Sequence, residues 1–395
     1  MMIEELNTAV TPGERSAMDR ALTLARSADF SRRGGNPRVG CVLLDPDGNR
    51  VAEGYHRGAG TAHAEADALS RVGPADGVRD HARTRVATAV VTLEPCAHHG
   101  RTGPCADLLI KAGVRRVVFA QTDPNPVAAG GAQRLRDAGV EVIAGHQTAE
   151  ATALNADWTF AQQVGRPRIR LKIAATLDGR IAAADGTSRW ITSQAARADG
   201  HRQRAAADAV LVGTGTVVAD DPLLTVRHVV PDESEQPLRA VFGTTPIPAA
   251  AAIRRCGPGL EPPLLLNTRS PYDAAASLRA RGVSSVLIEG GPRTAAIFLA
   301  AGLVDEVISY LAPSILGAGP AAVDDLGITT ISQALRGEIT DLADLGTGAD
   351  RCVRVTTRLN RSGLHREHPE TPSARTLRAT IHRTTKETHH VHRHH

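Results

Sequence analysis

The sequence predicts an α/β protein built from two domains, and three observations lead to this prediction. The chain has 395 residues, and a domain usually takes roughly 150. Apolar runs of strand length alternate with helical patterns, which is typical of α/β layers. This alternation stops near residue 154 and starts again after residue 167. We therefore expect one domain over residues 1–160, a second over 161–360, and a tail over 361–395.

The first half alternates strands and helices, so helices are expected on both faces of its sheet. The expected strands are 39–44, 51–55, 87–93, 114–120 and 140–144, and the expected helices are 18–27, 62–72, 106–112 and 133–138. The first two strands flank Asp45-Pro46-Asp47-Gly48, a turn sequence that predicts a hairpin. Residues 154–167 lack a clear period and are interpreted as the interdomain linker.

The second half restarts the same alternation. The expected strands are 169–174, 209–213, 238–242, 263–267, 285–289 and 306–312, and the expected helices are 193–206 and 293–301. The sequence after Asn360 is rich in Ser, Thr, His and Arg and has few large apolar residues, so we expect it to be disordered. The histidines of this tail have two possible interpretations, an extension without function and a metal-binding segment. We favour the first.

Composition and charge restrict the class of protein. The tail carries seven Lys and Arg against three Glu, an excess of four that equals the formal net charge of the whole chain. The part expected to fold is thus nearly neutral, which argues against a nucleic-acid partner. No apolar run is long enough to span a membrane, and the N-terminus lacks a basic secretory pattern, so we expect a cytoplasmic protein. Five scattered cysteines argue against a disulfide framework.

The strongest signal for chemistry is His63-Ala64-Glu65 followed by Cys96 and Cys105. One His and two Cys hold the metal ion in zinc deaminases, and a Glu beside the His moves protons without binding the ion. Two thiolates and a neutral imidazole cancel the charge of Zn²⁺ and leave one position for water. Glu65 lies two residues after His63, one turn into a helix, and is expected to take the proton from that water.

Each of these residues also has an ordinary structural interpretation. A lone His-x-Glu is common, and a single cysteine is often a buried core residue, as we expect for Cys41. The combination is much harder to attribute to chance. Its spacing differs from the C-x-x-C of many zinc deaminases, because eight residues separate Cys96 from Cys105.

The segment from 92 to 105 (TLEPCAHHGRTGPC) resembles the deaminase domain of the bifunctional riboflavin-biosynthesis family, RibD. The segments 36–42 (NPRVGCV), 54–56 (GYH), 63–65 (HAE) and 123–126 (DPNP) resemble the same family. The resemblance implies a cytidine-deaminase-like three-layer α/β/α domain. It also implies that four residues contact the pyrimidine and its ribosyl phosphate: Asn36, His56, His98 and Arg101.

The C-terminal half resembles the reductase domain of this family, which implies a dihydrofolate-reductase-like α/β domain using NADPH. The matching segments are 171–180 (LKIAATLDGR), 188–192 (SRWIT), 213–216 (GTGT), 219–227 (ADDPLLTVR) and 288–292 (IEGGP). Glu289-Gly290-Gly291-Pro292 joins an apolar strand to a helix, where glycines let a phosphate approach backbone N–H groups. The same glycines also suit an ordinary tight turn. No G-x-G-x-x-G follows a first strand, which argues against a Rossmann domain.

The resemblance implies the following reductase contacts. The dinucleotide is expected against Ala175, Trp190, Thr192, Thr216, Asp220, Thr244 and Gly291. The ribosyl-phosphate substrate is expected along Ser188, Arg204, Leu224, Arg227 and Glu289. The catalytic candidates in this half are Lys172, Asp220 and Glu289, with the proton donor left open between the last two. In one departure, Gly243 stands where the family commonly has an acidic residue.

We therefore predict hydrolytic deamination of 2,5-diamino-6-ribosylamino-4(3H)-pyrimidinone 5′-phosphate, followed by reduction of its ribosyl chain to ribityl. The expected cofactors are one Zn²⁺ per chain and NADPH, and the expected partners are this small-molecule substrate and further copies of the chain in a homo-oligomer. We expect no membrane partner. The alternatives are a nucleoside or nucleic-acid base deaminase, which predicts a basic face and C-x-x-C spacing, and a non-catalytic interaction domain, which predicts losses among the site residues.

Overall fold

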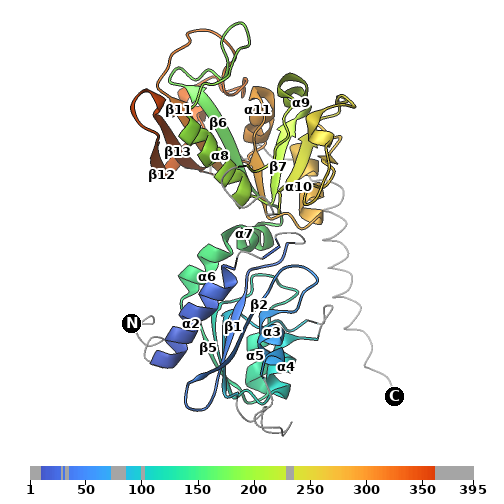
Figure 1. The fold of residues 1–395 in the computed structure, drawn as a ribbon, viewed down its shortest axis with the longest axis vertical. Coiled ribbons are helices and arrows are strands. Elements are labelled where there is room, and N and C mark those ends of the chain that lie inside the picture. Colours follow the sequence, from blue (N-terminus) through green and yellow to red (C-terminus); the bar gives the residue numbers. More distant parts are fainter. Residues whose placement is uncertain are drawn as a thin grey trace, which may run out of the picture.

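The computed structural model describes residues 10–27, 30–31, 35–72, 86–98, 103–227 and 235–360. Two sheets, each covered by helices, lie at opposite ends of the long axis of the molecule (Figure 1). None of the helices in these ranges is long and apolar enough to cross a membrane. The predicted tail at 361–395 lies outside the described residues.

The N-terminal sheet has five strands in the order β2-β1-β3-β4-β5. β1 pairs antiparallel with β2 and β3, whereas β3, β4 and β5 run parallel. The strands are β1 (Gly40–Leu44), β2 (Arg50–Tyr55), β3 (Thr88–Leu93), β4 (Arg116–Gln121) and β5 (Glu141–Ala144). The predicted strands are thus all present, with ends that differ by at most two residues.

Helices cover both faces of this sheet and give it three layers. Their bounds are α2 (Pro12–Ala25), α3 (Ala64–Ser70), α4 (Cys105–Lys111), α5 (Gly131–Asp137), α6 (Thr148–Leu154) and α7 (Ala156–Val164). One core holds side chains of α3, α4 and α5, and the other holds side chains of α2 and α6. α2 starts well before the predicted residue 18, because Thr11 and Glu14 form a reciprocal capping box at its N-terminus.

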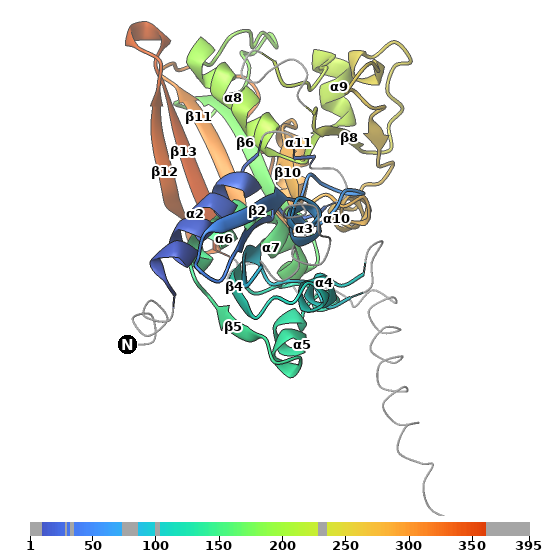
Figure 2. The same ribbon diagram turned by 60° about the horizontal axis from the view of Figure 1, so that its bottom comes forward.

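The C-terminal sheet has eight strands in the order β12-β13-β11-β6-β10-β7-β8-β9. The strands from β11 to β9 in this order run parallel, and β13 and β12 add an antiparallel hairpin at one edge (Figure 2). Their bounds are β6 (Arg168–Thr176), β7 (Ala209–Gly213), β8 (Leu238–Phe242), β9 (Leu264–Leu265), β10 (Ser285–Ile288), β11 (Glu306–Ala312), β12 (Gly337–Leu345) and β13 (Cys352–Leu359).

Four helices accompany this sheet: α8 (Gln194–Ala206), α9 (Thr214–Asp220), α10 (Pro271–Ala280) and α11 (Pro292–Ala300). Short 3₁₀ helices form at Ala252–Arg254, Ile331–Gln333 and Gly348–Asp350. α10 and α11 pack on one face of the sheet, while α8 and α9 pack on the other. The predicted strand at 263–267 is only two residues long as β9, and α9, α10, β12 and β13 were not predicted.

The segment interpreted as a linker is largely helical, since α7 occupies most of it. Figure 1 shows α7 between the two sheets. Its buried Trp158 joins the N-terminal core, and its Asp157 accepts hydrogen bonds from Arg170 on β6. An amphipathic helix of nine residues is too short to give a clear period when both of its faces make contacts.

Candidate active sites

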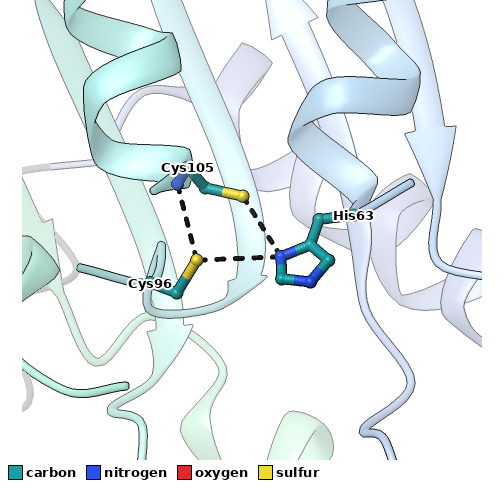
Figure 3. Close-up of side chains that lie close together, drawn as sticks. All are labelled: His63, Cys96 and Cys105. Carbon is teal, nitrogen blue, oxygen red and sulfur yellow. Dashed lines mark hydrogen bonds between the residues drawn. The ribbon is translucent and has the colours of Figure 1, made fainter. Parts of the chain in front are cut away.

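The metal-binding candidates meet where two helices begin. His63 is the N-cap of α3, Cys96 follows β3, and Cys105 is the first residue of α4. Nδ1 of His63 lies 3.3 Å from Sγ of Cys105 and 3.7 Å from Sγ of Cys96 (Figure 3). The three ligand atoms all lie within 4.8 Å of one another. This set of one imidazole and two thiols, converging from three segments, fits a Zn²⁺ ion.

Neighbouring groups prepare one of the two sulfurs for ionisation. Hydrogen bonds from Cys105 and His63 outweigh burial and lower the pKa of Cys96 to about 4. The backbone N–H of Cys105 also points to the sulfur of Cys96, at 3.4 Å. The hydrogen bond to Cys96 and burial together raise the pKa of Cys105. The directions of the two shifts make Cys96 the more acidic of the two thiols.

Glu65 lies beside this cluster in the first turn of α3 and is buried. Burial raises the pKa of its carboxyl group, against the opposing effect of His63. A raised pKa brings a carboxyl group closer to the range in which it both accepts and returns a proton. This matches the proton-shuttle role expected for Glu65.

The other described residues predicted for the deaminase site line the same cavity. Asn36, His56 and His98 lie around it together with His63, Glu65 and Cys96. Nδ1 of His56 lies 3.0 Å from the Ala62 carbonyl, so it carries the proton, and Nε2 accepts from the Asn36 amide at 2.9 Å. This leaves the amide oxygen of Asn36 to accept a hydrogen bond from a substrate. Arg101 lies outside the described residues.

Sequence reasoning gave no role to four further residues that line this cavity: Asp123, Asn125, Trp158 and Gln162. Asp123 and Asn125 follow β4, the parallel neighbour of β3, and parallel strands bring their carboxyl ends to one edge. The DPNP sequence after a predicted strand was therefore a usable signal. Trp158 and Gln162 belong to α7, which the linker interpretation left out. Burial raises the pKa of Asp123 to about 6.

Glu94, in the segment that leads to Cys96, has a structural task. Its carboxylate accepts hydrogen bonds from the backbone N–H groups of Asp123, at 3.2 Å, and Ala132, at 2.9 Å. α5 also approaches this segment closely, since a Cβ on Gly131 would lie 1.6 Å from the Pro95 carbonyl oxygen. The residues before Cys96 are thus held by the neighbouring strand end and by α5.

A second cavity lies near the carboxyl ends of β7 and β10, beside β6. Seven of the predicted reductase residues line it: Lys172, Arg204, Thr216, Asp220, Leu224, Glu289 and Gly291. Ala175, Ser188, Trp190, Thr192, Thr244 and Arg227 do not line this cavity. Residues that the sequence analysis did not single out, including Ile181, Pro222 and Ala322, also form its wall.

Glu289 is the electrostatic centre of this cavity. Its carboxylate accepts two hydrogen bonds from Arg204, through Nε and, at 2.9 Å, through Nη2, and a third from Nζ of Lys172 at 3.2 Å. Burial alone would raise the pKa of Glu289, but the two cations outweigh it and hold the pKa well below its ordinary value. The lowered pKa favours the anionic form of Glu289, which makes Glu289 a poor proton donor.

A glycine at the start of α11 lies in the cavity wall, and a second glycine follows β8 outside this wall. Gly291 is the N-cap of α11, and its N–H donates to the Thr216 hydroxyl of α9 at 3.0 Å. Gly243 follows β8 with a φ of 127°, and a Cβ there would lie 2.9 Å from Oγ1 of Thr214. The departure at Gly243 thus has a local cause, because only glycine fits this conformation beside Thr214.

Comparison with known proteins agrees with this two-site arrangement. The RibD C-terminal domain matches residues 167–349, and the cytidine and deoxycytidylate deaminase zinc-binding region matches residues 13–121. The RibD protein of Mycobacterium tuberculosis (strain H37Rv) is 42% identical over 338 residues, covering 84% of this chain and 95% of that protein. That of Escherichia coli K12 is 39% identical over 370 residues, covering 86% and 98%.

The chain belongs to the RibD family.

Solved structures agree with the sequence matches. A RibD structure from Acinetobacter baumannii has a TM-score of 0.75 and 36% identity, and the match covers 90% of this chain and all of that one. A Thermotoga maritima protein, described as a deaminase and a 5-amino-6-(5-phosphoribosylamino)uracil reductase, has a TM-score of 0.69 and 31% identity, covering 88% and 99%. The chain is thus a bifunctional deaminase and reductase of riboflavin biosynthesis, and the α/β fold class predicted for both domains is confirmed.

Proposed function

We propose that the N-terminal domain hydrolytically deaminates 2,5-diamino-6-ribosylamino-4(3H)-pyrimidinone 5′-phosphate with one Zn²⁺ held by His63, Cys96 and Cys105. The observation that carries this proposal is the convergence of their three ligand atoms beside the buried carboxyl of Glu65. When bound, the ion supplies Lewis acidity that activates a water molecule.

The protein residues around this ion position the ring and move protons. Glu65 takes one proton of the attacking water and gives it to the ring nitrogen, and it then moves the hydroxyl proton of the ring adduct to the amine, which leaves as ammonia. The amide oxygen of Asn36 accepts from the pyrimidine, because His56 fixes the amide through its other end. We assign the ribosyl phosphate to the side of His98, which lines the cavity, and we expect Arg101 to add a cation there, as the family resemblance implies.

We propose that the C-terminal domain then reduces the ribosyl group to ribityl with NADPH as the hydride source. The reaction places one hydride on C1′, breaks the bond from C1′ to the ring oxygen, and puts one proton on that oxygen. Lys172 carries an ammonium beside Glu289 and is the candidate that we favour to give this proton, with Asp220 as the alternative. Glu289 holds Lys172 and Arg204 in place.

The nucleotide is proposed to lie along Thr216, Gly291 and Thr244, with Ala175, Trp190, Thr192 and Asp220 as further contacts. One feature favours NADPH over NADH. Arg269 donates from Nε to the Thr244 hydroxyl at 3.1 Å, beside the proposed nucleotide contact. An arginine at this position suits the extra phosphate of NADPH.

The direct test is turnover of the diamino-pyrimidinone ribosyl phosphate by the purified, zinc-loaded chain, with ammonia release and NADPH oxidation followed together. We expect one ammonia per NADPH once both steps run to completion. NADPH oxidation without ammonia, or ammonia release that needs NADPH, would contradict the proposed order of steps.

A further inference from the structure

We propose that His201 and Gln236 are positioning residues of the reductase site, which fix the backbone of residues 224–227 from two sides. This segment carries Leu224 and Arg227, two of the expected substrate contacts. The inference rests on the proposed reductase function and adds two residues that neither the sequence analysis nor the cavity lining identified.

Helix α8 holds one side of the segment through two backbone groups. The N–H of Arg227 donates to Nδ1 of His201 at 3.3 Å. The carbonyl of Thr225 accepts from Nη1 of Arg204 at 3.0 Å. His201 and Arg204 are three residues apart and so lie on the same face of the helix. The helix therefore fixes alternate residues of the segment with neighbouring side chains.

Gln236, outside helix α8, holds Val226, the residue between them. The N–H of Val226 donates to Oε1 of Gln236 at 2.7 Å, and Nε2 of Gln236 donates to the Val226 carbonyl at 3.4 Å. A neighbouring strand would pair with the backbone N–H and C=O of one residue in the same way. Residues 221–227, however, have no strand partner. Side-chain hydrogen bonds thus replace sheet pairing over this segment.

The segment needs this support because its conformation is costly. Leu224 has a φ of 58°, in the left-handed region that non-glycine residues rarely occupy. Its side chain is buried, and the residue lines the reductase cavity. Without the bonds on both sides, the segment would be free to relax, and the substrate would have to order it on binding.

The charge state of His201 agrees with its role as an acceptor. Burial and the nearby cations Arg204 and Arg227 lower the pKa of His201 to about 4. The ring is therefore neutral at pH 7, with Nδ1 able to accept the Arg227 N–H. The hydrogen-bond geometry and the neutral ring both indicate that His201 accepts the hydrogen bond from Arg227.

The test uses the full zinc-loaded chain, with the deaminated ribosylaminouracil phosphate as reductase substrate. His201→Leu keeps a similar shape but removes the acceptor, and Gln236→Ala removes both bonds to Val226. Each is expected to raise the KM for this substrate about threefold to tenfold, the effect of losing roughly one hydrogen bond, with little change in kcat. His201→Asn places an amide oxygen near the position of Nδ1 and is expected to recover most of the loss.

Gln203→Ala, on the same helix, is the matched control and should behave as wild type. Ammonia release from the diamino substrate should be unchanged in every variant. Unchanged KM in both His201→Leu and Gln236→Ala would overturn the inference. So would an equal loss of both activities that His201→Asn does not recover, since that indicates a general folding defect. A wild-type chain without reductase activity would instead refute the proposed function itself.

Discussion

Arg170 on β6 donates two hydrogen bonds to the carboxylate of Asp157 on α7, at 3.0 and 2.7 Å. The next residue of α7, Trp158, lines the deaminase cavity, and Gln162 of the same helix accepts a hydrogen bond from Arg279 of α10 at 3.0 Å. One helix therefore forms part of the deaminase wall and is held by residues of the reductase domain.

This arrangement predicts that Asp157→Asn destabilises the deaminase domain more than the reductase domain. The change removes the carboxylate through which α7 is held to β6. We expect a loss of about 1.5–3 kcal/mol in the free energy of unfolding, typical of hydrogen bonds to charged groups. Urea denaturation measures this value. Arg351→Ala, which removes the exposed ion pair with Asp344, is the control and should cost less than about 1 kcal/mol. Equal effects of the two changes would count against the anchoring role.

Metal analysis of cysteine variants tests the zinc site. Cys96→Ser and Cys105→Ser should each lose most of the metal, since serine does not replace a thiolate as a soft ligand. Cys256→Ser, at an exposed position away from the cluster, should keep one zinc per chain. Stoichiometric zinc in both of the first two variants would rule out this ligand set.

The stability of the reductase domain should depend on the ionisation of Glu289. Glu289→Gln leaves Arg204 and Lys172 without their counterion and is expected to cost about 3 kcal/mol at pH 7. The pKa of Glu289 is lowered by folding, so its contribution is complete above the ordinary carboxyl pKa of 4.5 and is lost as the pH falls below it. The difference between wild type and variant should therefore shrink in acid.

Urea denaturation of both proteins at pH 7 and at pH 4 and below measures this difference. Glu338→Gln, at an exposed position on β12, serves as the control and should change little at either pH. A Glu289→Gln effect that is the same at all pH values would show that the carboxylate charge is not what stabilises the site.

Cofactor preference should depend on Arg269. Arg269→Ala is expected to raise the KM for NADPH several-fold and to leave the KM for NADH nearly unchanged, because only NADPH carries a 2′-phosphate. Steady-state kinetics with both nucleotides measures the ratio. An equal rise in both KM values would mean that Arg269 contacts a part shared by the two nucleotides.

The sequence could predict the three residues that meet in the candidate metal site because they lie at the ends of strongly patterned elements. His63, Cys96 and Cys105 flank α3, β3 and α4, whose apolar runs are clear. Trp158 and Gln162 could not be found in this way. They reach the deaminase cavity from α7, and the position of α7 depends on contacts with a second domain that no local pattern encodes.

In the reductase half, too, local patterns predict the strands but not the contacts between distant segments. The parallel strands β7, β8 and β11 were predicted with the ends that the structure shows, since short and mostly apolar runs mark them. The hairpin of β12 and β13 was missed because β12 is largely exposed and charged residues interrupt its apolar positions without a regular period, as Glu338, Asp341 and Asp344 illustrate. The ionic centre at Glu289 joins β6, α8 and the end of β10, and only the fold brings these segments together.

The central claim is that one chain holds two independent active sites, and the variant Glu65→Gln tests it most directly. This change keeps the three metal ligands but removes the proton carrier. Ammonia release from the diamino substrate should then fall by at least the roughly 10²–10⁴-fold typical of a single acid–base group. NADPH oxidation with the deaminated substrate should remain at the wild-type rate, and the zinc content should stay at one per chain. Loss of both activities to the same extent, with zinc retained, would contradict the account.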